Sequence, residues 1–373
     1  MKFTCNQVTL TKELNTVSKA VSSKTTINIL RGILIKVTSE GKLILTASDL
    51  DLSIEKSIDV ENYEEGSLVV MARLFEDIVR RLPSNTEVTV EESEDGNVYI
   101  RAGETEFKIV GLPAEEFPAL GEIEGAKDQL LIDKEILKEM IRKTSFSASI
   151  DESKGIIVGV LLEKKNDSFN MVALDGFRMA VCKKKISNEK ENSLIITAKI
   201  LNNLNKIISD IEEDTEVKII FSKKKALIEI EETKVVIRLL EGEFIKYNDI
   251  IPKEHKCRVI VNTSEMTDCI ERASLLAKEG KNNLIRMKIE DNSIIITSRS
   301  EEGNVREVIY AEIEGEGLEI GFNSKYILDV LKVTEDEKII MDFNSAVNPC
   351  IIRSVEEDKY EYLVLPVRIS NLG

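Results

Sequence analysis

The stretch MARLFEDIVRRLPSNTEVTV, residues 71–90, has two relatives further along the chain. TAKILNNLNKIISDIEEDTEVKI occupies residues 197–219, and NSKYILDVLKVTEDEKIIM occupies residues 323–341. Each stretch has the pattern of an amphipathic helix followed by an alternating strand. Similar stretches at a fixed, long spacing are typical of a repeated supersecondary unit. The sequence therefore predicts three similar units of about 120 residues each.

Two basic positions recur in all three stretches. The first is occupied by Arg73, Lys199 and Lys325, at intervals of 126 residues (199 − 73 and 325 − 199), and the second, at the same intervals, by Arg80, Lys206 and Lys332. Residues seven apart on a helix lie within about 20° of each other, so both positions share a face. The apolar residues centre on the opposite face, which we expect to pack on the core. They are Leu74, Phe75, Ile78, Val79 and Leu82, then Ile200, Leu201, Leu204, Ile207 and Ile208, then Tyr326, Ile327, Val330 and Leu331.

Each unit is predicted to contain two half-units. A second amphipathic stretch lies in the first part of each unit, within residues 10–21, 133–146 and 264–278, and alternating strands with short polar turns such as EDGN at residues 94–97 follow. A half-unit is then a strand, a helix and several strands. We expect an α+β fold of antiparallel sheets and helices, with domains at residues 1–124, 125–253 and 254–373.

Composition narrows the class of protein. The chain has 373 residues, is 42% hydrophobic and carries a net charge of −16, which is globular and disfavours whole-surface adhesion to nucleic acid. No apolar run approaches the roughly 20 residues of a membrane span, so we expect a cytoplasmic protein that does not bind membranes. The five cysteines are widely spaced and form no C-x-x-C pair, which indicates buried reduced thiols rather than a zinc site or a disulfide framework.

The outward basic face favours an extended anionic partner. On one helix it would be an ordinary solvated face, but its recurrence in three units suits a phosphate backbone bound without sequence preference. Six helices in a ring, at about 9 Å spacing, would leave a bore of only about 7 Å. Twelve helices, from two chains, would leave about 24 Å, which is wide enough for a duplex. The repeat count therefore favours a closed, symmetric dimer.

The chain resembles the bacterial DNA polymerase III beta subunit family along essentially its full length. The resemblance rests on the order and spacing of several stretches: MKFTCNQVTL from Met1, TTINILRGILIKV from Thr25, ASDLDLSIE from Ala47, VMARLFEDIVRRLP from Val70, ALDGFRMAVC from Ala173, GEFIKYNDIIP from Gly242 and YLVLPVRISNLG at the end. It implies three clamp domains per chain and a head-to-tail homodimer ring, with sheets outside and helices lining the bore.

The resemblance also implies a non-catalytic DNA sliding clamp, a processivity factor without cofactor. Such a ring encircles double-stranded DNA and is opened by an ATP-dependent clamp loader complex. It tethers the DNA polymerase III catalytic subunit and other replication and repair proteins, acting through effective concentration.

Two sets of site residues follow from the resemblance. The expected DNA-facing residues are Lys24, Arg73, Lys199 and Lys325, with Arg80, Lys206 and Lys332 added by the periodicity. The expected pocket for partner peptides is formed by Leu174, Gly176, Phe177, Arg178, Met179, Ile245, Ile250, Leu363, Leu365, Pro366, Val367 and Arg368. This chain departs from the family pattern at Ile245, where proline is common, and at Asp249, where arginine is common. Gly155 and Ile156 stand where the family has tyrosines.

Two other classes of function are weighed against this one. For an enzyme, the sequence offers one histidine, His255, in a polar linker, and acidic pairs such as Asp49 and Asp51, which we interpret as turn residues; it has no phosphate-binding loop. No metal site is indicated. The alternative to a clamp is a repeat scaffold that binds an acidic partner without encircling DNA.

Overall fold

The computed structural model describes residues 1–22, 25–118, 128–187, 190–356 and 359–369. These residues contain six α-helices, and the chain divides into two compact units, Met1–Leu137 with Lys206–Leu239 and Lys138–Asn205 with Leu240–Gly373. The helices are α1 (Gln7–Val17), α2 (Ala72–Arg81), α3 (Lys134–Thr144), α4 (Ala198–Ser209), α5 (Thr263–Glu279) and α6 (Ser324–Leu331). The predicted boundary at 124/125 lies outside the described residues, and both predicted boundaries stay predictions.

The repeat deduced from the sequence is confirmed at the helix starts. Helices α2, α4 and α6 begin at residues 72, 198 and 324, again 126 apart (198 − 72 and 324 − 198). Asn323 caps α6 because its side chain accepts a hydrogen bond from the Lys325 backbone amide at 3.0 Å. Helix α2 ends just before Pro83, which has no amide hydrogen to continue the helix.

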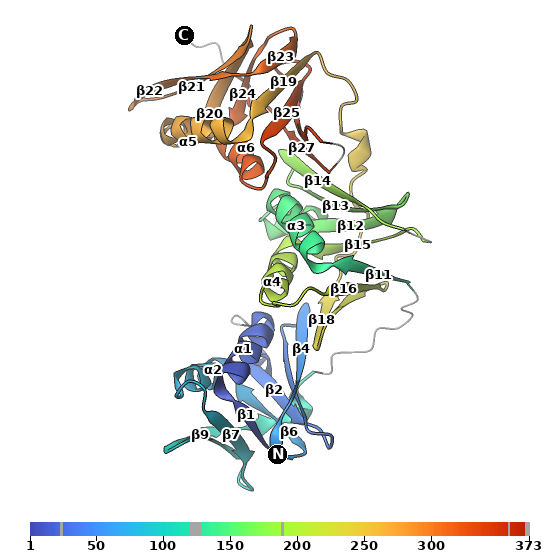
Figure 1. The fold of residues 1–373 in the computed structure, drawn as a ribbon, viewed down its shortest axis with the longest axis vertical. Coiled ribbons are helices and arrows are strands. Elements are labelled where there is room, and N and C mark those ends of the chain that lie inside the picture. Colours follow the sequence, from blue (N-terminus) through green and yellow to red (C-terminus); the bar gives the residue numbers. More distant parts are fainter. Residues whose placement is uncertain (23–24, 119–127, 188–189, 357–358, 370–373) are drawn as a thin grey trace. The chain divides into compact units, whose positions relative to one another are not determined.

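The first unit contains two antiparallel sheets (Figure 1). The five-stranded sheet has the order β5 (Glu61–Glu64), β1 (Lys2–Asn6), β7 (Glu87–Glu92), β8 (Asn97–Ala102), β9 (Thr105–Val110). The nine-stranded sheet has the order β10 (Leu112–Pro113), β6 (Gly66–Met71), β2 (Gly32–Val37), β3 (Lys42–Ser48), β4 (Leu52–Asp59), β18 (Thr233–Arg238), β17 (Lys225–Ile230), β16 (Glu216–Phe221), β11 (Asp128–Asp133). Its β4–β18 pairing joins the first repeat to the second.

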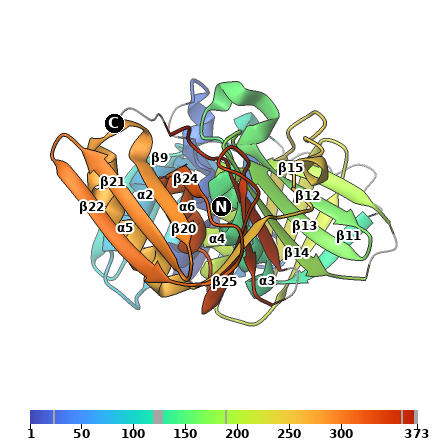
Figure 2. The same cartoon turned by 90° about the horizontal axis from the view of Figure 1, so that it is seen from above.

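The second unit is built in the same way. Its nine-stranded sheet has the order β15 (Asn192–Thr197), β12 (Gly159–Lys165), β13 (Ser168–Leu174), β14 (Arg178–Lys185), β27 (Tyr360–Val364), β26 (Cys350–Ser354), β25 (Lys338–Phe343), β19 (Cys257–Asn262), β23 (Glu312–Gly315). Its four-stranded sheet has the order β22 (Gly303–Tyr310), β21 (Ser293–Ser300), β20 (Leu284–Glu290), β24 (Glu319–Asn323), with β22 at the edge (Figure 2). Here the β14–β27 pairing joins the second repeat to the third.

The two half-units of a repeat exchange strands. Strand β1 precedes α1 but pairs with β7 of the following half-unit, whereas β6 precedes α2 but pairs back with β2. The same exchange joins β11 to β16 and β15 to β12 in the second repeat, and β19 to β25 and β24 to β20 in the third. A half-unit therefore cannot complete its own sheet, which explains why the helix and strand pattern repeats in pairs.

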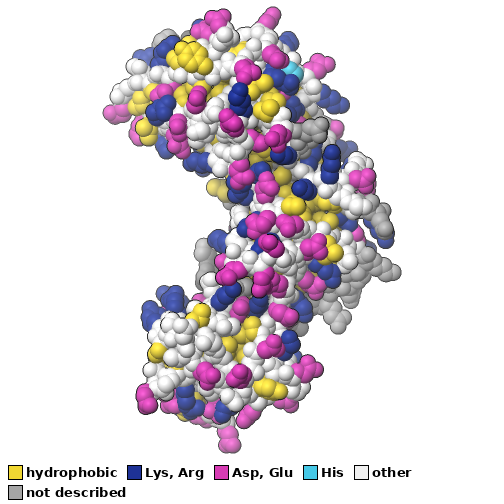
Figure 3. Space-filling view, viewed as in Figure 1, with side chains coloured by type: hydrophobic (Ala, Val, Ile, Leu, Met, Phe, Trp, Pro, Cys, Tyr) yellow, Lys and Arg dark blue, Asp and Glu magenta, His cyan; other side chains and the backbone are white. Residues whose placement is uncertain are grey.

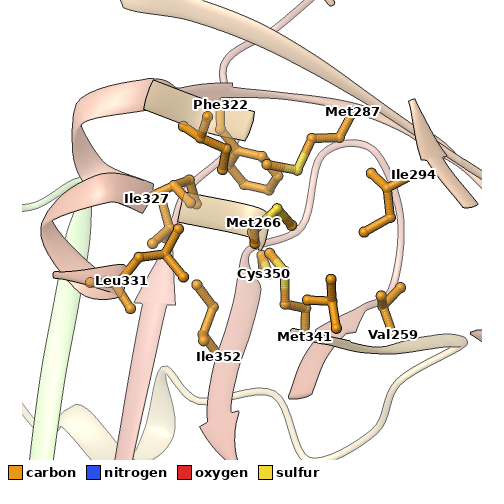
Figure 4. Close-up of a cluster of buried hydrophobic side chains, with 14 of the residues drawn as sticks. Val259, Met266, Met287, Ile294, Phe322, Ile327, Leu331, Met341, Cys350 and Ile352 are labelled. Carbon is orange, nitrogen blue, oxygen red and sulfur yellow. The ribbon is translucent and has the colours of Figure 1, made fainter. Parts of the chain in front are cut away.

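Helices and sheets are held together by apolar cores. In the third repeat, α5 and α6 pack on their sheets through Met266, Ile327 and Leu331, which meet Met287, Phe322 and Met341 (Figure 4). All these side chains are buried, and burying each one contributes about 1.5–3 kcal/mol. The apolar stripe read from the sequence is thus confirmed, with one exception. Leu74 is 51% exposed, whereas Ile200 at the equivalent position of α4 is buried, so neighbouring elements cover this flank position of the stripe in one helix and not in the other.

The five cysteines are free and buried, as predicted. Burial raises the pKa of the Cys5 thiol to about 11 and those of Cys182 and Cys269 to about 12. Because a raised thiol pKa disfavours the reactive thiolate, only about one thiol in a thousand or fewer is ionised at pH 8.

We therefore expect none of the five cysteines to react with a thiol-specific disulfide reagent within minutes at pH 8, and all five to react in denaturant. Absorbance of the released thiolate measures both. A fast native phase would show that at least one thiol is accessible.

Candidate functional site

Basic side chains occupy the outward faces of the three repeated helices. Among the described residues, all six expected positions, from Arg73 to Lys332, are exposed, while Lys24 lies outside the described residues. Lys332 follows the last residue of α6 and lies 3.9 Å from a Glu271 carboxylate oxygen. Both signs of charge are interspersed on the surface seen in Figure 3. The basic positions are therefore local features of an acidic protein.

Helix α2 carries three arginines, the most basic side chains of the three, together with Glu76 and Asp77. Arg80 and Arg81 both pair with Asp77 on the exposed side of the helix. The hydrogen bond from Arg81, together with the charges of Arg81, Arg80 and Arg73, holds the pKa of the Asp77 carboxyl below its usual range. Three guanidinium groups are thus balanced by the carboxylates of Asp77 and Glu76, which leaves one net positive charge on α2, against two on α4, where Lys199 and Lys206 have no acidic neighbour on the helix.

The expected peptide pocket begins at a tight turn between β13 and β14. One Asp175 carboxylate oxygen accepts hydrogen bonds from the amides of Phe177 and Arg178, at 2.8 and 3.0 Å. Gly176 has a φ of +94°, a conformation that a side chain would strain. The turn therefore holds the Phe177 ring out of the sheet, where it is exposed.

Arg178 lies under this turn and is only 9% exposed. Its guanidinium pairs with Asp175 at 3.1 Å and with Asp329 of α6 at 2.5 Å, and it donates to the Phe146 carbonyl at 2.8 Å. The same group lies over the Phe146 and Tyr326 rings, at 5.3 and 4.8 Å from their centroids. Its charge is thus fully engaged within the protein, and it supports the turn from below.

The C-terminal strand borders the turn. Strand β27 pairs with β14, with Met179 opposite Leu363, and the Leu365 amide donates to the Phe177 carbonyl at 2.9 Å. Further along, the Val367 amide donates to the Gly321 carbonyl at 2.8 Å. Leu365 and Arg368 are exposed, whereas Pro366 and Val367 are half-buried.

The loop at residues 244–251 completes the apolar surface. Tyr247 is buried in the same apolar cluster as Leu174, Met179 and Leu363, and its hydroxyl donates to Glu163 at 2.9 Å. Ile245 and Ile250 of the same loop remain exposed. A groove of about 510 Å³ runs along this loop, lined by Ile245, Tyr247 and strands β12 and β15. The structure thus brings Leu174, Met179 and Leu363 together in a buried apolar floor, whereas Ile245 is the one expected pocket residue, among the described residues, that lines the groove itself.

Sequence reasoning missed the residues that hold the turn from behind. Tyr326 stacks on Phe177, with ring centroids 6.2 Å apart, and Asp329 and Phe146 hold Arg178. These residues lie far from the DGFRMA stretch along the chain, and no local pattern marks them. Only their shared face on α6, where positions 326 and 329 are one turn apart, links the first two.

The residues considered for catalysis have structural roles. Asp49 accepts hydrogen bonds from the amides of Asp51 and Leu52, at 3.1 and 2.7 Å, which confirms a turn. His255 is exposed in its polar linker, and its ring lies 3.8 Å from the carboxylate of Asp342, which also binds Arg258. Among the described residues, no group of three or more His, Cys, Asp or Glu side chains is arranged to hold a metal ion.

None of the helices in the described part of the chain has the length and hydropathy of a membrane span.

Three families match the chain in succession. Residues 1–121 match the N-terminal domain of the DNA polymerase III beta subunit, residues 131–246 match its central domain and residues 248–368 match its C-terminal domain. The beta sliding clamp of Bacillus subtilis is 38% identical over 381 residues, with 99% of this chain and 100% of the relative covered. That of Staphylococcus epidermidis is 34% identical, with 99% of each chain covered.

Solved structures of DNA polymerase III beta subunits also match the chain. The crystal structure of the Bacillus subtilis DNA polymerase sliding clamp matches with a TM-score of 0.94 at 37% identity, covering 99% of this chain and 100% of that one. The beta subunit of Thermotoga maritima matches with a TM-score of 0.92 at 28% identity and the same coverage. The three-domain clamp fold expected from the sequence is therefore confirmed.

Proposed function

Because the chain belongs to the DNA polymerase III beta subunit family and is a DNA sliding clamp, we propose that two copies close head to tail around duplex DNA without catalysing a reaction. The observation that carries this proposal is the pairing of sheet edges. The chain joins its repeats edge to edge, through β4–β18 and through β14–β27. The corresponding edges at the two ends of the series, β9 and β22, have no partner strand on their outer sides among the described residues. Two copies can satisfy both edges at once only by closing a ring.

The two unpaired edges are also apolar. Phe107 and Val110 of β9 are exposed, and so are Val308 and Tyr310 of β22, the last of them 80%. Long, apolar, unpaired edges promote association, and soluble proteins normally cover or charge them. A second copy that pairs with these edges would cover part of this apolar surface, with Phe107 at its centre.

The outward helix faces would then line the bore. We assign phosphate contacts to Lys24, Arg73, Arg80, Lys199, Lys206, Lys325 and Lys332. Lysine and arginine contacts to phosphate are blind to sequence and weaken with salt, which suits a ring that must slide.

The surface around the Phe177 turn would receive partner peptides. Its buried floor and exposed Phe177, Ile245, Ile250 and Leu365 suit apolar side chains of a short segment. We propose that the DNA polymerase III catalytic subunit and the clamp loader complex bind there, in the cytoplasm. Since both would be tethered by a ring on the template, no chemistry by the clamp itself is required.

Imaging and solution mass test closure together. We expect negative-stain images of an annulus with an open centre, and a solution mass of twice 42.0 kDa. A single-chain mass with no central hole would favour a repeat scaffold that binds an acidic partner without encircling DNA.

Reversing two charges on α4 tests the bore. For the double variant Lys199→Glu and Lys206→Glu, we expect shorter retention on circular DNA after loading. The slope of log affinity against log salt should fall by about 0.9 for each phosphate that the variant no longer binds. Lys223→Glu with Lys224→Glu is the matched control, since both residues are exposed in the turn between β16 and β17. Equal retention of both variants would remove α4 from the DNA interface.

A further inference from the structure

The two joints within the chain share one strand register, and that register can be followed from the helix starts. From Val69, two residues before the cap of α2, the paired residues across the sheet are Leu34, Thr46 and Glu55. Glu55 is therefore the outermost member of this row in the first repeat.

The same path exists in the other two repeats. In the second repeat the path starts at Ile195, two residues before Thr197, which is the residue that precedes α4. It passes through Leu161 and Val172 to Val181. From Gly321, two residues before Asn323, it passes through Arg286 and Thr297 to Arg306. Glu55, Val181 and Arg306 are thus equivalent positions on the edge strands β4, β14 and β22.

The opposing edges are equivalent in the same sense. The paths start at Thr4, Leu131 and Ile260, each two residues before the residue that precedes α1, α3 or α5. The first path passes through Thr89 and Arg101 and ends at Glu106 of β9. The second passes through Lys218 and Glu229 and ends at Lys234 of β18. The third passes through Ile340 and Arg353 and ends at Glu361 of β27.

Within the chain, equivalent positions face each other. Glu55 lies opposite Lys234 at the first joint, and Val181 lies opposite Glu361 at the second. We infer that the third joint, between two copies, has the same register, so that Arg306 of one subunit lies opposite Glu106 of the partner subunit and this ion pair fixes the head-to-tail fit. The inference rests on the proposed ring and specifies the contact that closes it.

The charges on the two edges support this pairing. On the first unit, Lys2, Glu91, Arg101 and Glu106 form a row of alternating charge across four strands, with ion pairs of 3.3, 2.6 and 2.6 Å. Glu106 ends the row at the open edge and is 53% exposed. At the first joint a similar row crosses between repeats, since Lys218 pairs with Glu229 at 2.9 Å and Lys234 with Glu55 at 3.3 Å. A cation opposite Glu106 would extend the alternation across the third joint.

Arg306 meets that requirement. It is exposed on β22, and no carboxylate of the described residues lies within the 4.0 Å of an ion pair. Its neighbour Glu307 instead faces α5, where it binds Arg272 at 2.8 Å. In the same register, Val305 would lie opposite Phe107 of the partner subunit and Asn304 opposite the partner's Lys108.

Charge reversal tests the ion pair. We expect Arg306→Glu to raise the dimer dissociation constant about tenfold, because like charges then face each other at both joints of the ring. Adding Glu106→Arg should restore the constant to within about threefold of the wild type. Glu94→Arg controls for the change in net charge, because Glu94 lies in an exposed turn of the unit that contains Glu106. If the wild type is a dimer but Arg306→Glu and Glu94→Arg change the dimer dissociation constant equally, the register is wrong and the ring stands. If the wild type is a single chain, both the register and the ring are wrong.

Disulfide trapping tests the register independently of charge. A variant with Lys108→Cys and Asn304→Cys should oxidise to a covalent two-chain ring, because directly opposite residues lie within disulfide reach. Val110→Cys with Asn304→Cys moves the pair diagonally, beyond the roughly 7 Å limit, and should stay uncrosslinked. Crosslinking of the diagonal pair alone would place the strands two residues away from the inferred register.

Discussion

Replacing Phe107 with aspartate is expected to convert the ring into single chains at micromolar concentration. Phe107 lies on the open edge strand β9, and in the inferred register it meets Val305 of the partner subunit on the helix side of the sheet. Helix α5 packs against β22 on that side and carries Leu275, which is 65% exposed. An aspartate there would remove apolar packing worth about 2 kcal/mol at each joint and add a charge that has no partner. Since the ring has two joints, the dissociation constant should rise by about a thousandfold or more.

Light scattering after gel filtration measures the loss of the dimer, and circular dichroism tests whether each chain remains folded. Phe107→Leu should keep the dimer, because it retains most of the apolar packing. Leu50→Asp changes an apolar residue in the turn before β4 that is 52% exposed, against 39% for Phe107, and should also keep the dimer. If Phe107→Asp remained a dimer at nanomolar concentration, β9 would not be part of the closing interface.

The single-chain variant also separates two kinds of DNA binding. Basic residues on α2, α4 and α6 would still attract phosphates, so direct binding at low salt should survive. Retention on circular DNA at high salt should be lost, since it depends on closure and not on charge. Equal loss on linear and circular DNA in the wild type would argue against encirclement.

The repeats were predictable from sequence because the helix starts are fixed by local patterns. The interval of 126 residues holds to the residue in α2, α4 and α6, where the apolar stripe and the following strand recur together. Exposure of the basic positions followed from the same periodicity. Leu74 was misassigned because a period of 3.6 residues leaves flank positions undecided until the neighbouring elements are known.

The sheets could not be predicted in the same way. Strand exchange between half-units, such as β1 with β7 and β6 with β2, depends on pairings between segments far apart in the chain. Antiparallel pairing leaves no local mark that identifies the partner strand. The edge strands β9 and β22, which carry the proposed closure, therefore became visible only once the sheet order was known.

Burial of the candidate site residues was equally hidden. The stretch around Arg178 predicted a turn, and the resemblance placed the arginine in a pocket lining. The structure shows a guanidinium held by Asp175 and Asp329 and enclosed by two rings. Charge pairing over 151 residues of chain leaves no pattern in a single sequence.

Replacing Arg178 with methionine is expected to lower the free energy of unfolding by about 2–3 kcal/mol, because the half-buried carboxylates of Asp175 and Asp329 lose the charge-assisted hydrogen bonds of its guanidinium. Asp329 would lose its guanidinium partner, and Asp175 would keep only its backbone hydrogen bonds. A shift of the urea midpoint measures the effect. Arg178→Lys should recover part of the loss, because lysine keeps the charge but cannot bind both carboxylates and the Phe146 carbonyl at once.

Peptide affinity separates support of the turn from direct contact with a partner. Arg178 is almost fully engaged within the protein, so we expect it to act by holding the Phe177 turn against Tyr326. Asp329→Asn then serves as the diagnostic variant, since Asp329 belongs to α6 and not to the exposed apolar surface. It should weaken binding of a polymerase-derived peptide about as much as Arg178→Lys does, by roughly tenfold, with the same loss of Phe177 order in NMR spectra. If Asp329→Asn bound the peptide normally while Arg178→Lys did not, the arginine would contact the peptide directly, and its ion pair with Asp329 would not be needed for binding.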